Sequence, residues 1–295
     1  MRCDLHVHTT HSGMCTIPVA KRFCRESYTD AVAVYERLKR LGMDLVTVTD
    51  HDSIDAAESL RSRPDFFLSE EVTCRTPGGA EAHIGVYGIT EQDHIELQRR
   101  RTDAEAFAAY LGEKRLLASI NHVFSSLTGA RSLADFDWFS GALPAMETRN
   151  GAMLPAANRH ARAVCCWLGK APLGGSDAHI LQNAGSAWTG VRGARSIAEY
   201  LEGVRQGSGI VCGSSGGYRV LTRTVLQIGC ELMRETPWTR FLAPLLIAVP
   251  LVTLVNCWWE GVFAWRWNRK LRAAWGIPSR NPLGTFGKAP GRASA

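Results

Sequence analysis

Histidine and carboxylate side chains recur in short segments between residues 6 and 179, and these residue types hold divalent metal ions in proteins. His6 and His8 are two residues apart in an alternating segment, so both imidazoles and Asp4 lie on one face of a strand. Because of their positions, the candidate ligands are His6, His8, His51, Glu71, His83, His122, Asp177 and His179. The set is too large for one ion and predicts two or three ions sharing a bridging carboxylate.

The candidate ligands follow the ends of predicted strands. Alternating or apolar runs predict strands at 3–8, 45–49, 66–68, 83–87, 116–120, 145–147 and 172–175. Helical patterns separate several of them, at 28–41, 90–101, 103–111, 156–167 and 196–206. This alternation predicts an α/β fold with a mostly parallel, barrel-like sheet whose strand ends meet at one mouth.

In this order, the motifs resemble those of the PHP family, named for polymerase and histidinol phosphatase. They are Asp4-Leu5-His6-Val7-His8-Thr9, Thr49-Asp50-His51-Asp52, Glu71, His83, Asn121-His122, Glu147 and Gly175-Ser176-Asp177-Ala178-His179. The resemblance covers residues 1–213. It implies a distorted seven-stranded, TIM-like β/α barrel with a multinuclear site for Mn, Fe or Zn ions that acts on phosphate esters.

The resemblance also implies how the ligands divide among the ions. His6, His8, Glu71 and Asp177 would hold the first ion, and His83 and His122 the second, with Glu71 bridging the two. His51 and His179 would belong to a third site. Glu70, adjacent in the sequence, is the alternative to Glu71. Glu147 is expected to support a ligand rather than to bind an ion.

The chain departs from the family pattern at the third site. The family continues its first motif with Ser-Asp-Gly, whose Asp binds the third ion, whereas this chain reads His11-Ser12-Gly13-Met14-Cys15. Gly13 stands where that carboxylate is expected. His11 or Cys15 could replace it, or the third site could be weak or empty, which would leave a dinuclear enzyme.

The expected chemistry is hydrolysis of a phosphate ester by a metal-bridged hydroxide, because two ions lower the pKa of a shared water. His179 or His51 would protonate the leaving oxygen, and Arg149, with Asn150 and Arg159, would hold the substrate phosphate. By resemblance, the substrate is a nucleotide phosphomonoester or an oligonucleotide end, with a histidinol-phosphatase-like activity as an alternative. A second alternative is a catalytically weak metal-binding module that regulates or localises a partner at the membrane.

The chain has 34 basic and 28 acidic residues, and the excess is confined to its C-terminal part. Residues 214–295 hold 11 basic and 3 acidic side chains, whereas residues 1–213 hold 23 and 25. An extended nucleic-acid-binding face over the first part is therefore not expected. The glycine- and serine-rich stretch near residue 215 predicts a boundary between a catalytic domain (1–215) and a helical segment (216–277), followed by a disordered basic tail (278–295).

Residues 241–259 form an uncharged apolar run of 19 residues, long enough to be considered as a transmembrane helix. Pro244, Pro250 and Asn256 interrupt it, and basic residues follow it at 266–272. These features favour an interfacial or re-entrant segment on an anionic membrane surface, and the alternative is a helix packed on the barrel or on a second subunit.

The nine cysteines, an odd number, and an N-terminus without a signal peptide favour a reducing compartment. We therefore expect a cytoplasmic protein, peripheral or monotopic at the inner face of the cell membrane.

Overall fold

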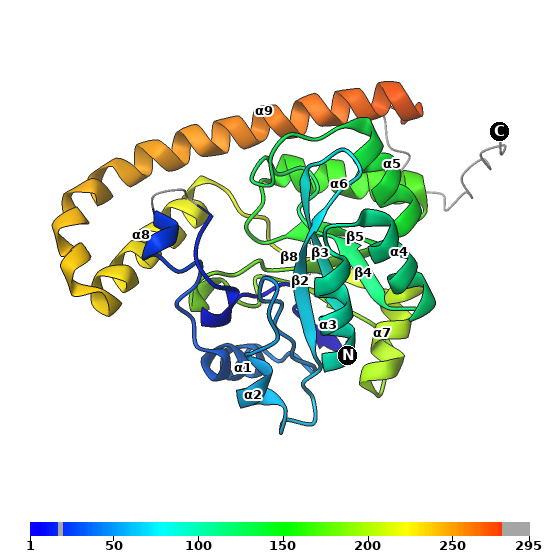
Figure 1. The fold of residues 1–295 in the computed structure, drawn as a ribbon, viewed down its shortest axis with the longest axis horizontal. Coiled ribbons are helices and arrows are strands. Elements are labelled where there is room, and N and C mark those ends of the chain that lie inside the picture. The colour runs from blue at the N-terminus through cyan, green and yellow to red at the C-terminus, as the bar shows by residue number, and fades with distance from the viewer. Residues whose placement is uncertain (17–19, 279–295) are drawn as a thin grey trace.

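The computed structural model describes residues 1–16 and 20–278, which form a mixed α/β body with a projecting helical hairpin (Figure 1). Strands β2 (Ser69–Arg75), β3 (Glu81–Tyr87), β4 (Leu117–Ile120), β5 (Ala145–Asn150) and β6 (Ala171–Gly175) form one sheet in that order. The pairs β2–β3 and β3–β4 are antiparallel, whereas β4–β5 and β5–β6 are parallel. Strands β1 (Arg2–Cys3), β7 (Ala187–Gly190) and β8 (Ile210–Gly213) form a second, antiparallel sheet in the order β1-β7-β8.

The described strands form two sheets, so one continuous seven-stranded ladder is not shown. Beyond Cys3, which ends β1, the predicted strands at 3–8 and 45–49 run between the two sheets with isolated bridges, such as Val7 with Ala178. Backbone and side chain both join them: the N–H of Thr49 donates to the carbonyl of Val7 at 2.8 Å, and the Thr49 hydroxyl accepts from the N–H of Val7 at 3.0 Å. The predicted strand at 66–68 instead precedes β2, which begins at Ser69.

Most of the helices that surround the sheets lie where the periodicity predicts them, although their first and last residues differ. They are α1 (Ala31–Arg40), α2 (Ala57–Leu60), α3 (Glu91–Arg100), α4 (Ala104–Glu113), α5 (Leu133–Ala142), α6 (Pro155–Leu168) and α7 (Ile197–Arg205), with short 3₁₀ turns η1 (Thr10–Ser12), η2 (Ala20–Arg22) and η3 (Leu181–Asn183). Local chemistry sets their starts, since the Asp30 carboxylate accepts from the N–H of Ala33 and Thr90 forms a capping box with Asp93. The helices α2 and α5 and the strands β7 and β8 were not predicted from the sequence.

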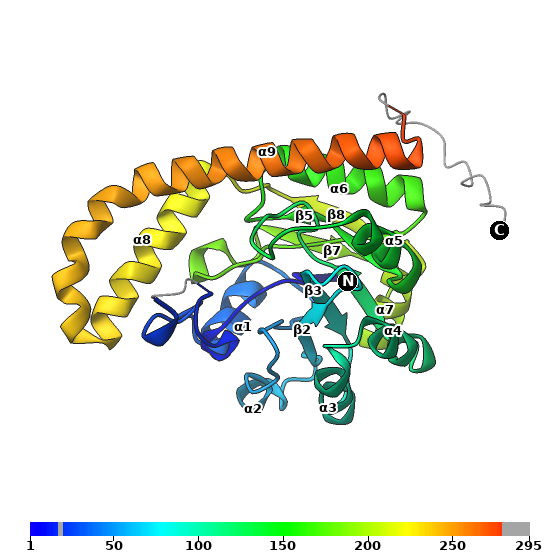
Figure 2. The same ribbon diagram turned by 45° about the horizontal axis from the view of Figure 1, so that its top comes forward.

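The C-terminal segment is a hairpin of α8 (Tyr218–Glu235) and α9 (Val249–Trp275) joined by the 3₁₀ helix η4 (Pro237–Ala248). Its closed end projects away from the sheets, while the second half of α9 runs along α6 (Figure 2). Ala264, Trp267 and Leu271 are buried in the same core cluster as Phe136 of α5. The end of the helical segment therefore belongs to the core of the body. Most of the predicted disordered tail, residues 279–295, lies outside the described residues.

Candidate metal centre

Four predicted ligands meet in a buried group at the ends of the central strands. The Nε2 atoms of His6 and His8 lie 3.2 and 3.4 Å from Glu71 Oε2. The same two nitrogens lie 3.5 and 3.4 Å from Asp177 Oδ1. Two ligand atoms that share one ion at 2.0–2.2 Å are roughly 3–3.5 Å apart. Each of these four contacts thus has the spacing of two ligand atoms around one divalent ion, and His6, His8 and Asp177 form one group of potential ligands.

The other oxygen of Glu71 faces two further histidines. His122 Nε2 lies 3.3 Å and His83 Nδ1 3.7 Å from Glu71 Oε1. His83 Nδ1 is buried and has no hydrogen-bond partner in the structure, which is costly for a polar atom unless something else binds it. Among the potential ligand groups, His122 lies with His6 and Glu71, and His83 lies with His51 and Glu71, so Glu71 is shared between the groups.

The choice between the two adjacent glutamates follows from the alternation of β2. Glu71 points toward the histidines, whereas Glu70 points to the opposite face and accepts hydrogen bonds from His94 Nδ1 and Gln98 Nε2, both at 2.9 Å. Consecutive side chains of a strand face opposite sides, so only one of the pair can reach the centre. His94 is therefore a partner of Glu70.

Buried polar groups hold the ligands from behind. Glu147 Oε1 accepts a hydrogen bond from His6 Nδ1 at 2.8 Å, as expected for a supporting carboxylate. His8 Nδ1 lies 2.9 Å from the Ser12 hydroxyl, which donates to Asp50 at 2.6 Å. Asn150, predicted to hold the substrate phosphate, instead donates to Glu147 and Asp177, both at 2.9 Å. Its amide therefore orients the centre.

The proximity of opposite charges favours ionised carboxylates in the metal-free centre. Burial alone would raise the pKa of Glu71 and Asp177, but neighbouring histidines, His6 above all, hold both pKa values well below the ordinary range. Burial and the neighbouring His179 lower the pKa of His8 to about 4. Ionised carboxylates and a neutral imidazole are the protonation states that bind metal ions.

The backbone has unusual φ angles and close approaches at the residues that carry the candidate ligands. Asp177 and His122 have positive φ angles, 50° and 27°, which non-glycine residues rarely adopt. At Gly175 a Cβ atom would overlap the backbone of His6, so only glycine lets β6 approach the ligand strand so closely. Local strain and close approach of this kind are concentrated at functional sites.

Comparison with known proteins tests the resemblance to the PHP family. A family model described as PHP-associated matches residues 155–208. A two-domain protein from Bacteroides vulgatus containing a predicted PHP-like metal-dependent phosphoesterase has 14% identity and a TM-score of 0.54, with 76% of this chain and 69% of that chain covered. The resemblance to the PHP family is confirmed. PsfC from Pseudomonas syringae has 17% identity and a TM-score of 0.54, with 80% and 98% covered. The comparison with curated proteins gives no match.

Where the sequence predicts a third site, the structure gathers His8, His51 and His179 into one group of potential ligands. His11 and Cys15, the predicted substitutes for the missing carboxylate, are not part of the ligand groups formed by the described residues. Glu26, which the sequence did not single out, faces the group: its Oε2 lies 3.4 Å from His51 Nε2 and its Oε1 lies 3.4 Å from His179 Nε2. No local spacing marks Glu26, because it lies in an irregular loop between η2 and α1.

Arg149, the other predicted catalytic residue, lies on β5 of the PHP fold, two residues after Glu147. Its guanidinium donates to the Ser215 hydroxyl at 3.3 Å. Arg159, on α6, is exposed. The structure therefore groups His51 and His179 with the ligands and gives Arg149 a partner in the segment that follows β8.

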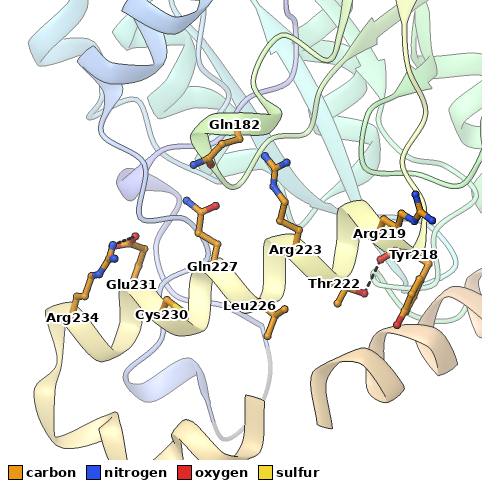
Figure 3. A pocket seen from close by; sticks show the side chains of 10 residues that line it. All are labelled: Gln182, Tyr218, Arg219, Thr222, Arg223, Leu226, Gln227, Cys230, Glu231 and Arg234. Atoms are coloured by element: carbon orange, nitrogen blue, oxygen red, sulfur yellow. Dashed lines mark hydrogen bonds and ion pairs between the residues drawn. The ribbon is translucent and has the colours of Figure 1, made fainter. Parts of the chain in front are cut away.

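Two adjoining pockets lie beside the candidate metal centre along α8. The smaller, of about 250 Å³, is lined by His179 and Tyr28 and shares Gln227 and Glu231 with a larger one of about 670 Å³. In the larger pocket Arg223 and Gln227 extend from α8 toward Gln182 (Figure 3). The hairpin thus contributes polar side chains to a groove that reaches the centre.

Proposed function

We propose that the chain is a metal-dependent phosphoesterase. The observation that carries this proposal is Glu71, a buried carboxylate whose two oxygens face two separate groups of histidines within about 3.7 Å. A shared carboxylate between two ligand groups is the arrangement of dinuclear hydrolytic centres. The native ion is proposed to be Mn, Fe or Zn, since mixed imidazole and carboxylate ligands suit all three.

Divalent ions held by these residues would acidify a shared water and neutralise phosphoryl oxygens. The protein's own part is to fix the ligands, through Glu147 on His6 and Asn150 on Asp177. His51 and His179 lie at the solvent side of the group, with 13% and 19% of their side chains exposed. There they meet the substrate first, and a histidine not bound to an ion can protonate the leaving-group oxygen.

For the substrate, we propose a nucleotide phosphomonoester or the end of an oligonucleotide. The groove along α8 supports this choice, because Arg219 and Arg223 offer guanidinium groups for additional phosphates and Tyr218 offers an aromatic face. A small ester such as p-nitrophenyl phosphate would occupy the centre without reaching these residues.

The substrate proposal predicts a selective effect of Arg223→Ala. With Mn²⁺ or Zn²⁺ present, the full-length chain should hydrolyse both p-nitrophenyl phosphate and members of a nucleotide panel. The variant should raise KM for nucleotides by roughly 10-fold, the loss of one charge-assisted hydrogen bond, and leave KM for p-nitrophenyl phosphate unchanged. Steady-state phosphate release measures both values.

Arg195→Ala is a suitable control, since that arginine is exposed near the start of α7 and does not line the groove. Equal effects of Arg223→Ala on both substrates would contradict the substrate proposal. No turnover of any ester by the unaltered chain would contradict the phosphoesterase itself and favour a metal-binding regulatory module.

We further propose that the closed end of the hairpin inserts into an anionic membrane surface. By length and composition alone, Pro237–Trp275 could cross a bilayer, with a mean hydropathy of 2.0 in its most apolar window. The second half of α9 is held in the core, however, so the free apolar part is η4 and the first half of α9. The exposed side chains there include Phe241, Leu245, Ile247, Leu251, Val252, Leu254, Val255, Trp258 and Trp259. Tryptophans beside aliphatic residues suit the interfacial region of a bilayer.

Vesicle binding tests this attachment. The full-length chain should sediment with vesicles containing anionic lipid, and the double variant Leu251→Asp with Val255→Asp should remain in the supernatant, because both side chains are exposed and would carry charge into the apolar region. Ile95→Asp, at an exposed apolar position of α3, should leave binding unchanged. An unaltered chain that stays in solution with vesicles would instead favour a second subunit as the cover of this surface.

A further inference from the structure

The Glu26 carboxylate lies between the imidazoles of His51 and His179, and His51 Nε2 also lies 3.4 Å from Glu71 Oε2. The two oxygens of Glu26 are each 3.4 Å from a different nitrogen, His51 Nε2 and His179 Nε2. Among the described residues, His51 and His179 are the ion-pair partners of the Glu26 carboxylate. Each contact taken singly has the spacing of two ligand atoms around one ion with bonds of about 2.0–2.2 Å, although Glu26 lies outside the groups whose potential ligand atoms are all within 4.8 Å of one another.

The backbone places Glu26 directly beside Gly13, where the first histidine motif lacks a carboxylate. Met14 and Arg25 form an antiparallel bridge, and the N–H of Glu26 donates to the carbonyl of Gly13 at 3.1 Å. Gly13 itself has a φ of 79° and open space around it. A carboxylate carried by the neighbouring segment therefore reaches the space beside His51 and His179 that Gly13 leaves without an acidic group.

The hairpin supports the segment that carries Glu26. The Arg25 guanidinium pairs with Glu235 at the end of α8 at 3.0 Å, and the ring of Phe23 packs against Trp238 with centroids 5.3 Å apart. These contacts flank Glu26 on one side and hold an otherwise irregular loop near the centre. The same hairpin lines the pocket that contains His179, so it contacts both the Glu26 loop and that pocket.

We propose that Glu26 is the carboxylate ligand of a third divalent ion, which it holds together with His51 and His179. The proposal rests on the metal-binding part of the proposed function and adds a ligand from outside the recognised motifs. His51 and His179 then act on a substrate through the ion they hold, rather than as free proton donors. A trinuclear centre follows, despite Gly13.

Metal stoichiometry tests the assignment without relying on turnover. The full-length chain is stripped with a chelator, loaded with excess Mn²⁺, desalted and measured by mass spectrometry of the elements. We expect three ions for each unaltered chain and two for Glu26→Gln, which keeps the side-chain shape but loses the charge. Glu58→Gln, an exposed position of α2 with the same change of charge, should retain three. Circular dichroism establishes that each variant is folded.

Two ions in the unaltered chain, or three in folded Glu26→Gln, would overturn the proposal. Anomalous scattering from Mn²⁺-loaded crystals of the unaltered chain removes any dependence on the variant's folding. A peak within bonding distance of Glu26, His51 and His179 supports the third site, and peaks only around Glu71 overturn it. Three ions that require Glu26, in a chain that hydrolyses no ester, would uphold this ligand assignment and refute the phosphoesterase proposal.

Discussion

Asp177→Asn should reduce phosphate release by about 10³-fold or more and remove one metal ion from each chain. The carboxylate lies against His6 and His8, and the loss of a charged ligand forfeits several kcal/mol of transition-state stabilisation, at about 1.4 kcal/mol for each factor of 10. Asparagine is the suitable replacement because, like aspartate, it tolerates the positive φ of this position. Steady-state rates and ion counts on the full-length variant measure the effect.

Asp55→Asn is the matched control, since this aspartate is exposed and contributes to none of the ligand groups. Its rate and metal content should equal those of the unaltered chain. A folded Asp177→Asn variant with full activity would show that the buried group is not the reaction centre.

Trp267→Ala should destabilise the protein by roughly 3–5 kcal/mol, which is typical of a large aromatic residue removed from a core. The indole is only 7% exposed and packs 4.9 Å from the ring of Phe136, between α9 and α5. For a chain of this size we expect the Tm to fall by roughly 10 °C. Thermal unfolding followed by circular dichroism provides the measurement.

Trp258→Ala, two to three turns earlier on the same helix, removes an indole that is 65% exposed and should change stability by less than about 0.5 kcal/mol. The contrast tests whether α9 is divided into a core half and a free half. Equal, small effects of the two substitutions would mean that the end of α9 does not contribute to the core.

The convergence of the histidines was predictable because local rules carry most of it. Two histidines at i and i+2 must share a face of an extended segment, and strand ends in an α/β fold meet at one edge. His6, His8, His83, His122 and Asp177 accordingly lie in a set of potential ligand groups that overlap at His6 and Glu71. The helices were predictable for a similar reason, since apolar periodicity and capping residues such as Asp30 and Thr90 are local signals.

The features that were missed depend on contacts between distant segments. Glu26 reaches the centre only because Met14 pairs with Arg25, which nothing in the local spacing indicates. Asn150 has the residue type of a phosphate ligand, but the carboxylates of Glu147 and Asp177 occupy its amide. Most of residues 3–8 and 45–49 make isolated bridges rather than long ladders, because periodicity does not distinguish a paired strand from an extended segment.

In the C-terminal segment, packing contacts cross the boundary that composition predicts near residue 215. The sequence suggests one continuous apolar segment, but in the structure its first part is exposed and its last part is buried in the core. Residues near Ala264 meet α6, and Glu260 accepts a hydrogen bond from the N–H of Ser126 at 3.1 Å, in the loop that follows His122. A boundary at 215 would separate these partners, which is why each experiment uses the full-length chain.

The most direct test is a stepwise titration of the metal-free, full-length chain with Mn²⁺ while phosphate release from p-nitrophenyl phosphate is followed. A centre bridged by Glu71 predicts little activity with the first equivalent and a steep rise as the second is added, because the two ions act on one shared site. Activity that is complete after one equivalent, or that is absent at any metal concentration, would contradict it.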